Sequence, residues 1–157
     1  MAYLYLTNSF EKILINDEDK ERCLNHSWHK VTNDSGSAII TSDINGITTS
    51  LGRYILNYNG PLDIDHRDRN YLNNQKNNLR IATRQQNLAN QPYYINNTSG
   101  YKGVTWHKKS KKWYAQIKVN RQHIHLGTFH DIKLAAKAYN DAAVKYFGEF
   151  AWLNKID

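Results

Sequence analysis

The segment "DIDHRDRNYLNNQKNNLRIATRQQNLANQ", residues 63–91, decides how the rest of the chain is interpreted. Seven of its 29 residues are Asn, a composition more typical of a solvated loop than of a packed element. It nevertheless holds an Asp-His pair, the short apolar run "LRIA", and a Thr83 to Gln86 spacing that matches a capping box. We therefore predict strand, long loop, strand and helix over 63–92, with Pro92 ending the helix.

Three side chains of this segment suit the hydrolysis of a phosphodiester. His66 titrates in the range of a general base. Asp65 points to the opposite side of an extended backbone and offers a hard oxygen ligand, and Asn87 in the predicted helix offers a second. Such ligands favour one Mg²⁺ or Mn²⁺ ion and do not suit zinc. A bare Asp-His pair would also fit a loop that the two residues only cap and bridge.

The same segment resembles the HNH (ββα-metal) endonucleases, particularly the homing type encoded by phages and introns. The pattern "DH-x-D…LNN…NLR-x-AT…QN" covers almost all of 65–87. The resemblance implies that Asp65 and Asn87 bind the metal and that His66 is the base. It implies that Asn78 is the central Asn, which ties the loop and orients the base. It further implies contacts with the DNA backbone from Arg80, Arg84 and Arg53.

Two positions depart from the pattern of that family. Arg69 stands where the family usually has Gly, so we expect Asn70 to take the left-handed conformation in the turn after Asp68. An upstream element that often carries a His appears here as Gly-Arg-Tyr-Ile at 52–55, which leaves Arg53 as a phosphate contact. A degenerate, inactive member of the family would look similar outside the key residues.

The C-terminal residues show a different periodicity. The runs "VTWHK", "KWYAQIKVN" and "HIHLGTF" alternate with period two, and a helical run follows with Asp131 as N-cap and Gly148 as its end. We expect a three-stranded antiparallel sheet that the helix covers on one side through Ala135, Tyr139, Ala142, Ala143 and Tyr146. The other face of the sheet is polar and basic, with Gln116, Lys118, His123 and His125 pointing outward.

Residues 100–157 resemble the AP2/ERF DNA-binding domain over its whole length, through "KGV-x-W", "KW-x-A-x-I", "LGTF" and "AA-x-AY-x-AA". That family lays its sheet in the major groove. The matching positions that would face DNA are Lys102, Thr105, His107, Lys112, Gln116, Lys118, His123 and His125. The turn "KKSKK", which includes Lys108, suits phosphates, although it is also compatible with a solvated hairpin tip. His123 and His125 on one face leave a zinc site as a minor alternative.

The distribution of charge agrees with a polyanionic partner. The chain of 157 residues has a net charge of +7, and residues 99–157 alone hold 11 Lys and Arg against 4 Asp and Glu. The single Cys23 excludes a disulfide framework and a Cys-based zinc site. Without a signal-peptide pattern or a run of about 18 apolar residues, we expect a cytoplasmic protein with no membrane partner.

Together these features predict an α+β protein with four parts. These are a small mixed N-terminal unit at 1–62, the nuclease module at 63–92, a linker at 93–99 and the AP2-like domain at 100–157. Within 1–62, Asn45-Gly46 predicts a tight hairpin, and Leu51, Ile55 and Leu56 predict a helix that Gly60-Pro61 closes. The expected activity is metal-dependent cleavage of double-stranded DNA, nicking at or near a recognised site, with a homodimer if both strands are cut. By resemblance, the gene would belong to a phage or intron in a bacterial host. The alternatives are a non-catalytic DNA-binding regulator and a restriction-type or low-specificity nuclease.

Overall fold

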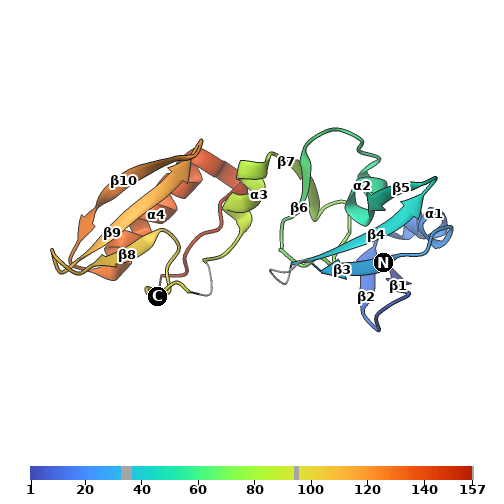
Figure 1. Cartoon of the computed structure of the whole chain (residues 1–157), viewed down its shortest axis with the longest axis horizontal. Helices are drawn as coiled ribbons and strands as arrows, with labels where there is room; N and C mark the ends of the chain where they lie inside the picture. Colours follow the sequence, from blue (N-terminus) through green and yellow to red (C-terminus); the bar gives the residue numbers. More distant parts are fainter. Residues whose placement is uncertain (33–36, 94–95, 157) are drawn as a thin grey trace. The chain divides into compact units, whose positions relative to one another are not determined.

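The computed structural model describes residues 1–32, 37–93 and 96–156. The described residues form a mixed α+β structure with several small antiparallel sheets and four α-helices (Figure 1). The chain divides into two compact units, Met1–Ala82 and Thr83–Asp157. Residues 94–95 of the predicted linker lie outside the described residues. Within the described ranges, no helix is long and apolar enough to cross a membrane.

The first unit begins with two small antiparallel sheets. β1 (Ala2–Tyr5) pairs with β2 (Lys12–Ile15), and α1 (Lys20–Leu24) follows a 3₁₀ turn at Asp17–Asp19. β3 (His29–Thr32), β4 (Ala38–Ile44) and β5 (Ile47–Ser50) form the second sheet in that order, and α2 (Leu51–Leu56) follows. Asn45 and Gly46 both have positive φ, as a tight hairpin turn requires, so the hairpin predicted there is confirmed.

The end of α2 differs from the expectation that Gly60-Pro61 closes it. Asn57 adopts the left-handed conformation, and its N–H donates to the carbonyls of Arg53 and Tyr54. Asn tolerates positive φ better than most residues, so the helix ends before it reaches the Gly-Pro pair.

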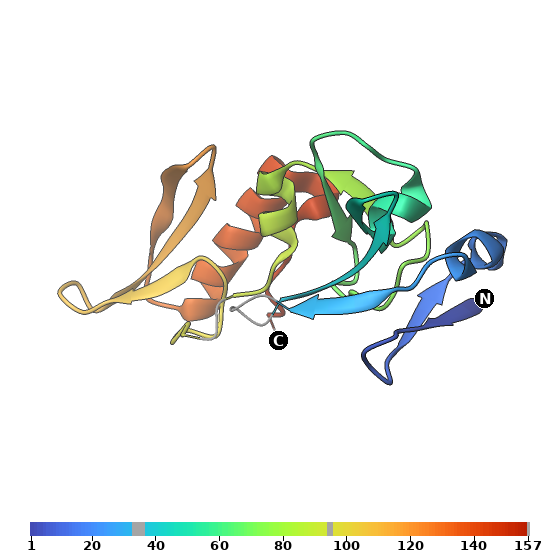
Figure 2. The same cartoon turned by 45° about the vertical axis from the view of Figure 1, so that its right-hand side comes forward.

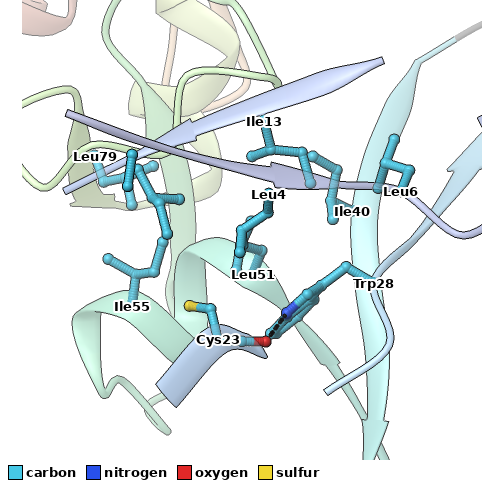
Figure 3. Packing of buried hydrophobic residues seen from close by; sticks show 11 residues of the cluster. Leu4, Leu6, Ile13, Cys23, Trp28, Ile40, Leu51, Ile55 and Leu79 are labelled. Carbon is cyan, nitrogen blue, oxygen red and sulfur yellow. Dashed lines mark hydrogen bonds between the residues drawn. The ribbon is translucent and has the colours of Figure 1, made fainter. Parts of the chain in front are cut away.

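One apolar core joins the elements of the first unit (Figure 3). Leu4 and Ile13 enter it from the β1–β2 hairpin, Ile40 from β4 and Ile55 from α2. Trp28 is also fully buried in this core, and its indole N–H donates to the Cys23 carbonyl at 2.9 Å. Leu79 of β7 (Leu79–Ala82) belongs to the same cluster. The strand pair within residues 63–82, which is predicted to hold Asp65 and His66, is therefore packed into the N-terminal core.

In this hairpin, β6 (Asp63–His66) pairs antiparallel with β7. The register places Asp65 opposite Arg80 and His66 opposite Leu79. The long loop 67–78 connects the two strands. The strand, loop and strand predicted from the sequence are confirmed, and they form part of the first compact unit.

The second unit begins with α3 (Arg84–Asn90), whose predicted capping box is confirmed. The Thr83 side chain accepts from the Gln86 N–H, and the Gln86 side chain accepts from the Thr83 N–H. β8 (Val104–His107), β9 (Lys112–Val119) and β10 (Gln122–Phe129) form an antiparallel sheet with β9 in the middle. α4 (Ile132–Phe147) lies along one side of this sheet (Figure 2).

The helix α4 meets the sheet almost as expected. Its buried residues are Ala135, Ala136, Tyr139, Ala142, Ala143 and Phe147. Tyr146, which we expected on this face, is 40% exposed, so that assignment is wrong and Phe147 takes the inner position. Asp131 caps the start of the helix by accepting from the Lys133 N–H, and Gly148 ends it.

Gly103 allows α4 to approach the sheet closely. Its φ is +75°, and a Cβ there would lie 2.0 Å from a ring carbon of the buried Tyr139. A side chain at this position would therefore be strained by its backbone and would collide with the core.

Candidate functional site

The strand β6 directs Asp65 and His66 to opposite sides, as the alternation of a strand requires. Asp65 faces Arg80, whose Nε and Nη2 each lie 2.7 Å from Asp65 Oδ2. The two residues are only 3% and 8% exposed. The guanidinium thus compensates a carboxylate that would otherwise be buried without a counter-charge. The structure thus shows Arg80 as an internal support of Asp65, and its predicted DNA contact stays a prediction.

His66 is mostly buried on the other side of β6. Its Nε2 lies 3.1 Å from Oδ1 of Asn74. Burial lowers the pKa of His66 below its ordinary value, although the bond to Asn74 and the nearby Asp68 and Asp65 oppose this effect. This shift favours the neutral ring, the state in which an imidazole can accept a proton. His66, Asn74 and Tyr71 also line a hollow of about 140 Å³ together with Ile64.

Asn78 ties the loop between the strands, as predicted. Its Oδ1 accepts from the Asp68 N–H at 3.0 Å, and its Nδ2 donates to Asp68 Oδ1 at 2.8 Å and to the Asn73 carbonyl at 2.7 Å. Burial alone would raise the pKa of Asp68, but bonds from Asn70, Asn73 and Asn78 lower it overall. Asn74 also contacts His66, since its Oδ1 lies 3.1 Å from His66 Nε2, and the predicted role of Asn78 in orienting the base stays a prediction.

The turn after Asp68 corrects another expectation. Arg69 itself has a φ of 64°, so it occupies the left-handed conformation that we expected at Asn70. Asn70 instead closes the turn through its hydrogen bonds, since its N–H donates to Asp68 Oδ1 and its Oδ1 accepts from the Leu72 N–H. Side-chain bonds of this kind are how Asn stabilises turns.

The N-terminal hairpin holds the far side of this loop. The Leu14 N–H donates to the Leu72 carbonyl and the Asn74 N–H donates to the Leu14 carbonyl, both at 2.8 Å. These bonds form a short parallel bridge between β2 and the loop. Two residues farther along, the Lys76 N–H donates to Asn16 Oδ1 at 2.8 Å. Residues about 60 positions earlier in the chain therefore define the shape of the loop.

A second attachment joins the loop to the turn of the same hairpin. The Tyr71 hydroxyl donates to the Glu11 carboxylate, which also accepts from Lys30 Nζ at 2.9 Å and Ser9 Oγ at 3.0 Å. The bond from Tyr71, followed by those from Lys30 and Ser9, lowers the pKa of Glu11 to about 2. The carboxylate is thus ionised throughout the physiological range, and it links three segments of the first unit.

Arg53 on α2 has backbone partners in the following loop. Its guanidinium donates to the carbonyls of Gly60 at 2.8 Å and Leu62 at 2.5 Å, and lies over the Tyr58 ring. The structure thus shows Arg53 ordering the segment that leads into β6. Its predicted phosphate contact stays a prediction.

The predicted metal ligands belong to different units, Asp65 to the first and Asn87 of α3 to the second. Both carry oxygen donors, which suits a hard ion such as Mg²⁺ or Mn²⁺. Among the described residues, no group of three or more His, Cys, Asp or Glu side chains is gathered to hold a metal ion. The assignment of Asp65 and Asn87 as metal ligands therefore stays a prediction.

Two cations of the second unit were predicted to contact DNA near α3. Arg84 is exposed in the first turn of this helix. Lys102 differs, because its Nζ donates to the carbonyls of Ala89 at 2.8 Å and of Gln91. A cation at the C-terminal end of a helix satisfies its last carbonyls, so the structure gives Lys102 a capping role.

The outer face of the β8–β10 sheet brings the other predicted residues together. The register places His107 opposite Lys112, Gln116 opposite His125 and Lys118 opposite His123. Exposed side chains on this unit are Thr105, Lys108, Lys118, His123 and His125, and partly exposed ones are His107, Lys112 and Gln116. We call the face formed by residues 105, 107, 112, 114, 116, 118, 123 and 125 the polar sheet face.

Tyr114 is a member of the polar sheet face that sequence reasoning did not select. The His107 ring stacks on it with centroids 4.5 Å apart and planes at 6°, and the His125 ring meets it edge-on at 5.3 Å. A row of rings thus crosses all three strands of the sheet. The outward parity of Tyr114 in its strand was visible in the sequence, and its aromatic character marked it as a surface contact.

The comparisons with known proteins concern parts of the chain. It is 42% identical over 100 residues, 60% of its length, to a protein of Acanthamoeba polyphaga mimivirus named an uncharacterized HNH endonuclease. It is 42% identical over 59 residues, 35% of its length, to Protein 3.8 of Escherichia phage T7. The chain spans about half the length of these curated relatives, 48% and 49%. No family model and no solved structure matches it.

Proposed function

We propose that the chain is a metal-dependent DNA endonuclease of the HNH type, which nicks double-stranded DNA at or near a recognised site. The observation that carries the proposal is the end of β6. The His66 imidazole, which contacts Asn74, and the Asp65 carboxylate, which pairs with Arg80, come from adjacent residues that point to opposite faces of the strand. The similarity to a protein named an HNH endonuclease supports the same assignment.

In the proposed reaction, His66 accepts a proton from the water whose oxygen attacks phosphorus. The new P–O bond forms as the bond to the 3′ oxygen breaks, which leaves 5′-phosphate and 3′-hydroxyl ends. Asp65 and Asn87 are the residues that would hold a Mg²⁺ or Mn²⁺ ion, which would supply positive charge to stabilise the leaving oxygen. Arg80 donates to Asp65 and holds its side chain in place. One such site cuts one strand, so cleavage of both strands requires a dimer or two successive events.

The second unit provides DNA binding in this proposal. The polar sheet face carries polar side chains that can contact base edges, and the lysines of the β8–β9 turn can contact phosphates. This use of the sheet follows the AP2-like resemblance of residues 100–157. The relatives come from a virus and a phage, and we propose that the chain acts in the cytoplasm of a bacterial host on behalf of a phage or mobile intron.

The test is cleavage of supercoiled plasmid and genomic DNA with Mg²⁺ or Mn²⁺ against EDTA. Wild type is compared with His66→Ala, and with His29→Ala as a matched control on β3, whose ring contacts Thr41. We expect metal-dependent nicking that His66→Ala lowers about 10²- to 10⁴-fold and His29→Ala leaves unchanged. DNA binding by gel shift is retained in both variants.

The alternatives give different results in the same assay. Binding without cleavage in wild type, with or without metal, contradicts the nuclease and favours a DNA-binding regulator. Cleavage at many unrelated sites contradicts site recognition and favours a low-specificity or restriction-type nuclease. Cleavage that survives His66→Ala contradicts the assignment of the base.

A further inference from the structure

We propose that Asn74 is the positioning residue of the general base, holding the proton on Nε2 of His66 so that Nδ1 accepts the proton of the attacking water. This inference rests on the proposed function, in which His66 is the base. It goes beyond that function by assigning the tautomer of the base and the residue that sets it. Asn74 acts through His66 and is not itself assigned a contact with DNA.

The orientation of the Asn74 amide follows from its second partner. Asn74 Nδ2 lies 2.8 Å from the Tyr71 carbonyl. A carbonyl oxygen only accepts hydrogen bonds, so the NH₂ group must face Tyr71 and Oδ1 must face His66. The reversed amide would set two acceptors against each other.

The amide orientation then determines the tautomer of the imidazole. Asn74 Oδ1 lies 3.1 Å from His66 Nε2 and can only accept, so Nε2 must carry the hydrogen. A neutral imidazole has one N–H, and the lone pair consequently resides on Nδ1. The nitrogen protonated in the resting ring is thus the one that faces Asn74, and the basic nitrogen is the other.

The position of Asn74 is itself fixed from outside the loop. The residue is 1% exposed, and its N–H donates to the Leu14 carbonyl of β2 at 2.8 Å. The Leu14 N–H donates to the Leu72 carbonyl, so hydrogen bonds to Leu14 hold the loop on both sides of residue 73. A buried amide with backbone and side chain both engaged cannot swing away from His66 without breaking several bonds.

The roles of two neighbouring asparagines make this assignment specific. Asn78 closes the loop onto Asp68 and the Asn73 carbonyl. The Asn73 side chain donates to Asp68 Oδ2 at 2.7 Å and accepts from the Gln75 N–H. Asn73 and Asn74 are adjacent in the same loop, and the bonds of the Asn73 side chain hold the loop, whereas Asn74 Oδ1 meets His66 Nε2. Asn73 therefore provides a matched control for damage to the loop.

The experiment is ¹H–¹⁵N long-range correlation of the imidazole of His66 in the ¹⁵N-labelled full chain, at a pH where the ring is neutral. Protonated and unprotonated ring nitrogens resonate far apart, so the spectrum reports the tautomer directly. Wild type is compared with Asn74→Ala, Asn74→Asp and Asn73→Ala, and the backbone amide spectrum verifies that each variant is folded. His66→Ala identifies the resonance.

We expect His66 in wild type to carry its hydrogen on Nε2. Asn74→Ala should mix the tautomers, whereas Asn73→Ala should keep the wild-type state. Asn74→Asp retains an acceptor oxygen and should restore the Nε2–H form, which tests the inference even if Asn74→Ala does not fold. A wild-type ring with its hydrogen on Nδ1, or a tautomer unchanged in folded Asn74→Ala, would overturn the inference.

DNA cleavage provides the second readout. Asn74→Ala should lower kcat about 10- to 100-fold with little change in KM, and Asn73→Ala should have a smaller effect. A normal kcat in Asn74→Ala with altered tautomers overturns the positioning role. A chain that shows the Asn74-dependent tautomer but cleaves no DNA contradicts the proposed function and not the tautomer assignment, so the two failures are distinguishable.

Discussion

Arg80 Nε lies 2.7 Å from Asp65 Oδ2 in the first unit, and both side chains are almost fully buried. A buried ion pair costs desolvation when it forms and leaves an uncompensated charge when only one partner is removed. Asp65, the proposed metal ligand, thus depends on Arg80, a cation that also stabilises the fold.

Replacing Arg80 with Met should therefore destabilise the first unit by about 3–5 kcal/mol, since Asp65 would lose its counter-charge. The measurement is urea unfolding followed by tryptophan fluorescence, to which Trp28 in the same core contributes together with the three tryptophans of the second unit. The exposed Arg84→Met is the control and should change stability by less than about 0.5 kcal/mol. Asp65→Asn combined with Arg80→Met should recover part of the loss. Equal stability of the two single variants would contradict the structural role of Arg80.

The rate of cleavage should persist to lower pH than an ordinary histidine would allow. Burial lowers the pKa of His66, so the neutral base remains populated below about 6.5, the usual value, and is lost only as the pH falls further. The measurement is the single-turnover rate between about pH 5 and 8 at saturating DNA and metal. An acid limb centred at or above 6.5 would count against His66 as the base. The control His29→Ala should leave the limb in place.

Acid should detach the loop from the β1–β2 hairpin. The pKa of Glu11 is lowered to about 2, so its contribution to stability is complete above the unfolded value and is lost as the pH falls through about 2. Wild type should therefore lose more stability than Glu11→Gln between about pH 4.5 and 2. Urea unfolding at several pH values measures this difference, with the exposed Glu21→Gln as control. Parallel pH curves for wild type and Glu11→Gln would refute the prediction.

DNA binding should weaken with salt in proportion to the phosphates contacted. With about five contacts, the slope of log affinity against log salt is about −4.5, and Lys108→Ala should reduce its magnitude by about 0.9. Fluorescence anisotropy with a duplex measures the slope. Lys137→Ala is the matched control, because Lys137 lies on α4 and pairs with Asp141 at 2.8 Å. If both variants change the slope equally, the β8–β9 turn has no special role.

Sequence patterns predicted the elements whose cause is local. The Thr83 and Gln86 capping box, the Asn45-Gly46 turn and the alternation in β9 each depend on residues a few positions apart, and each is present in the structure. The buried face of α4 was predicted except at Tyr146, because the aromatic side chain that packs inward is that of the next residue, Phe147.

Residues whose role depends on distant partners escaped prediction. Seven asparagines in 63–91 offer no local signal for which one meets His66, because Asn74 is selected by Leu14, 60 positions earlier. An isolated cation in the sequence also gives no sign of a partner within the fold. The structure pairs Arg80 with Asp65 and Lys102 with the end of α3, and tertiary packing determines these pairs. The DNA contacts predicted for both residues stay predictions.

The bridge between β2 and the loop also has a consequence for synthesis. A chain emerges from the ribosome N-terminus first, so the β1–β2 hairpin is available before residues 72–74 have been made. Closing a loop of about 60 residues costs little more entropy than closing a shorter one, but it delays the contact. The proposed catalytic loop thus takes its shape late, by pairing with a β1–β2 hairpin that is translated early. A chain interrupted before residue 72 contains this hairpin but lacks the part of the loop that pairs with it.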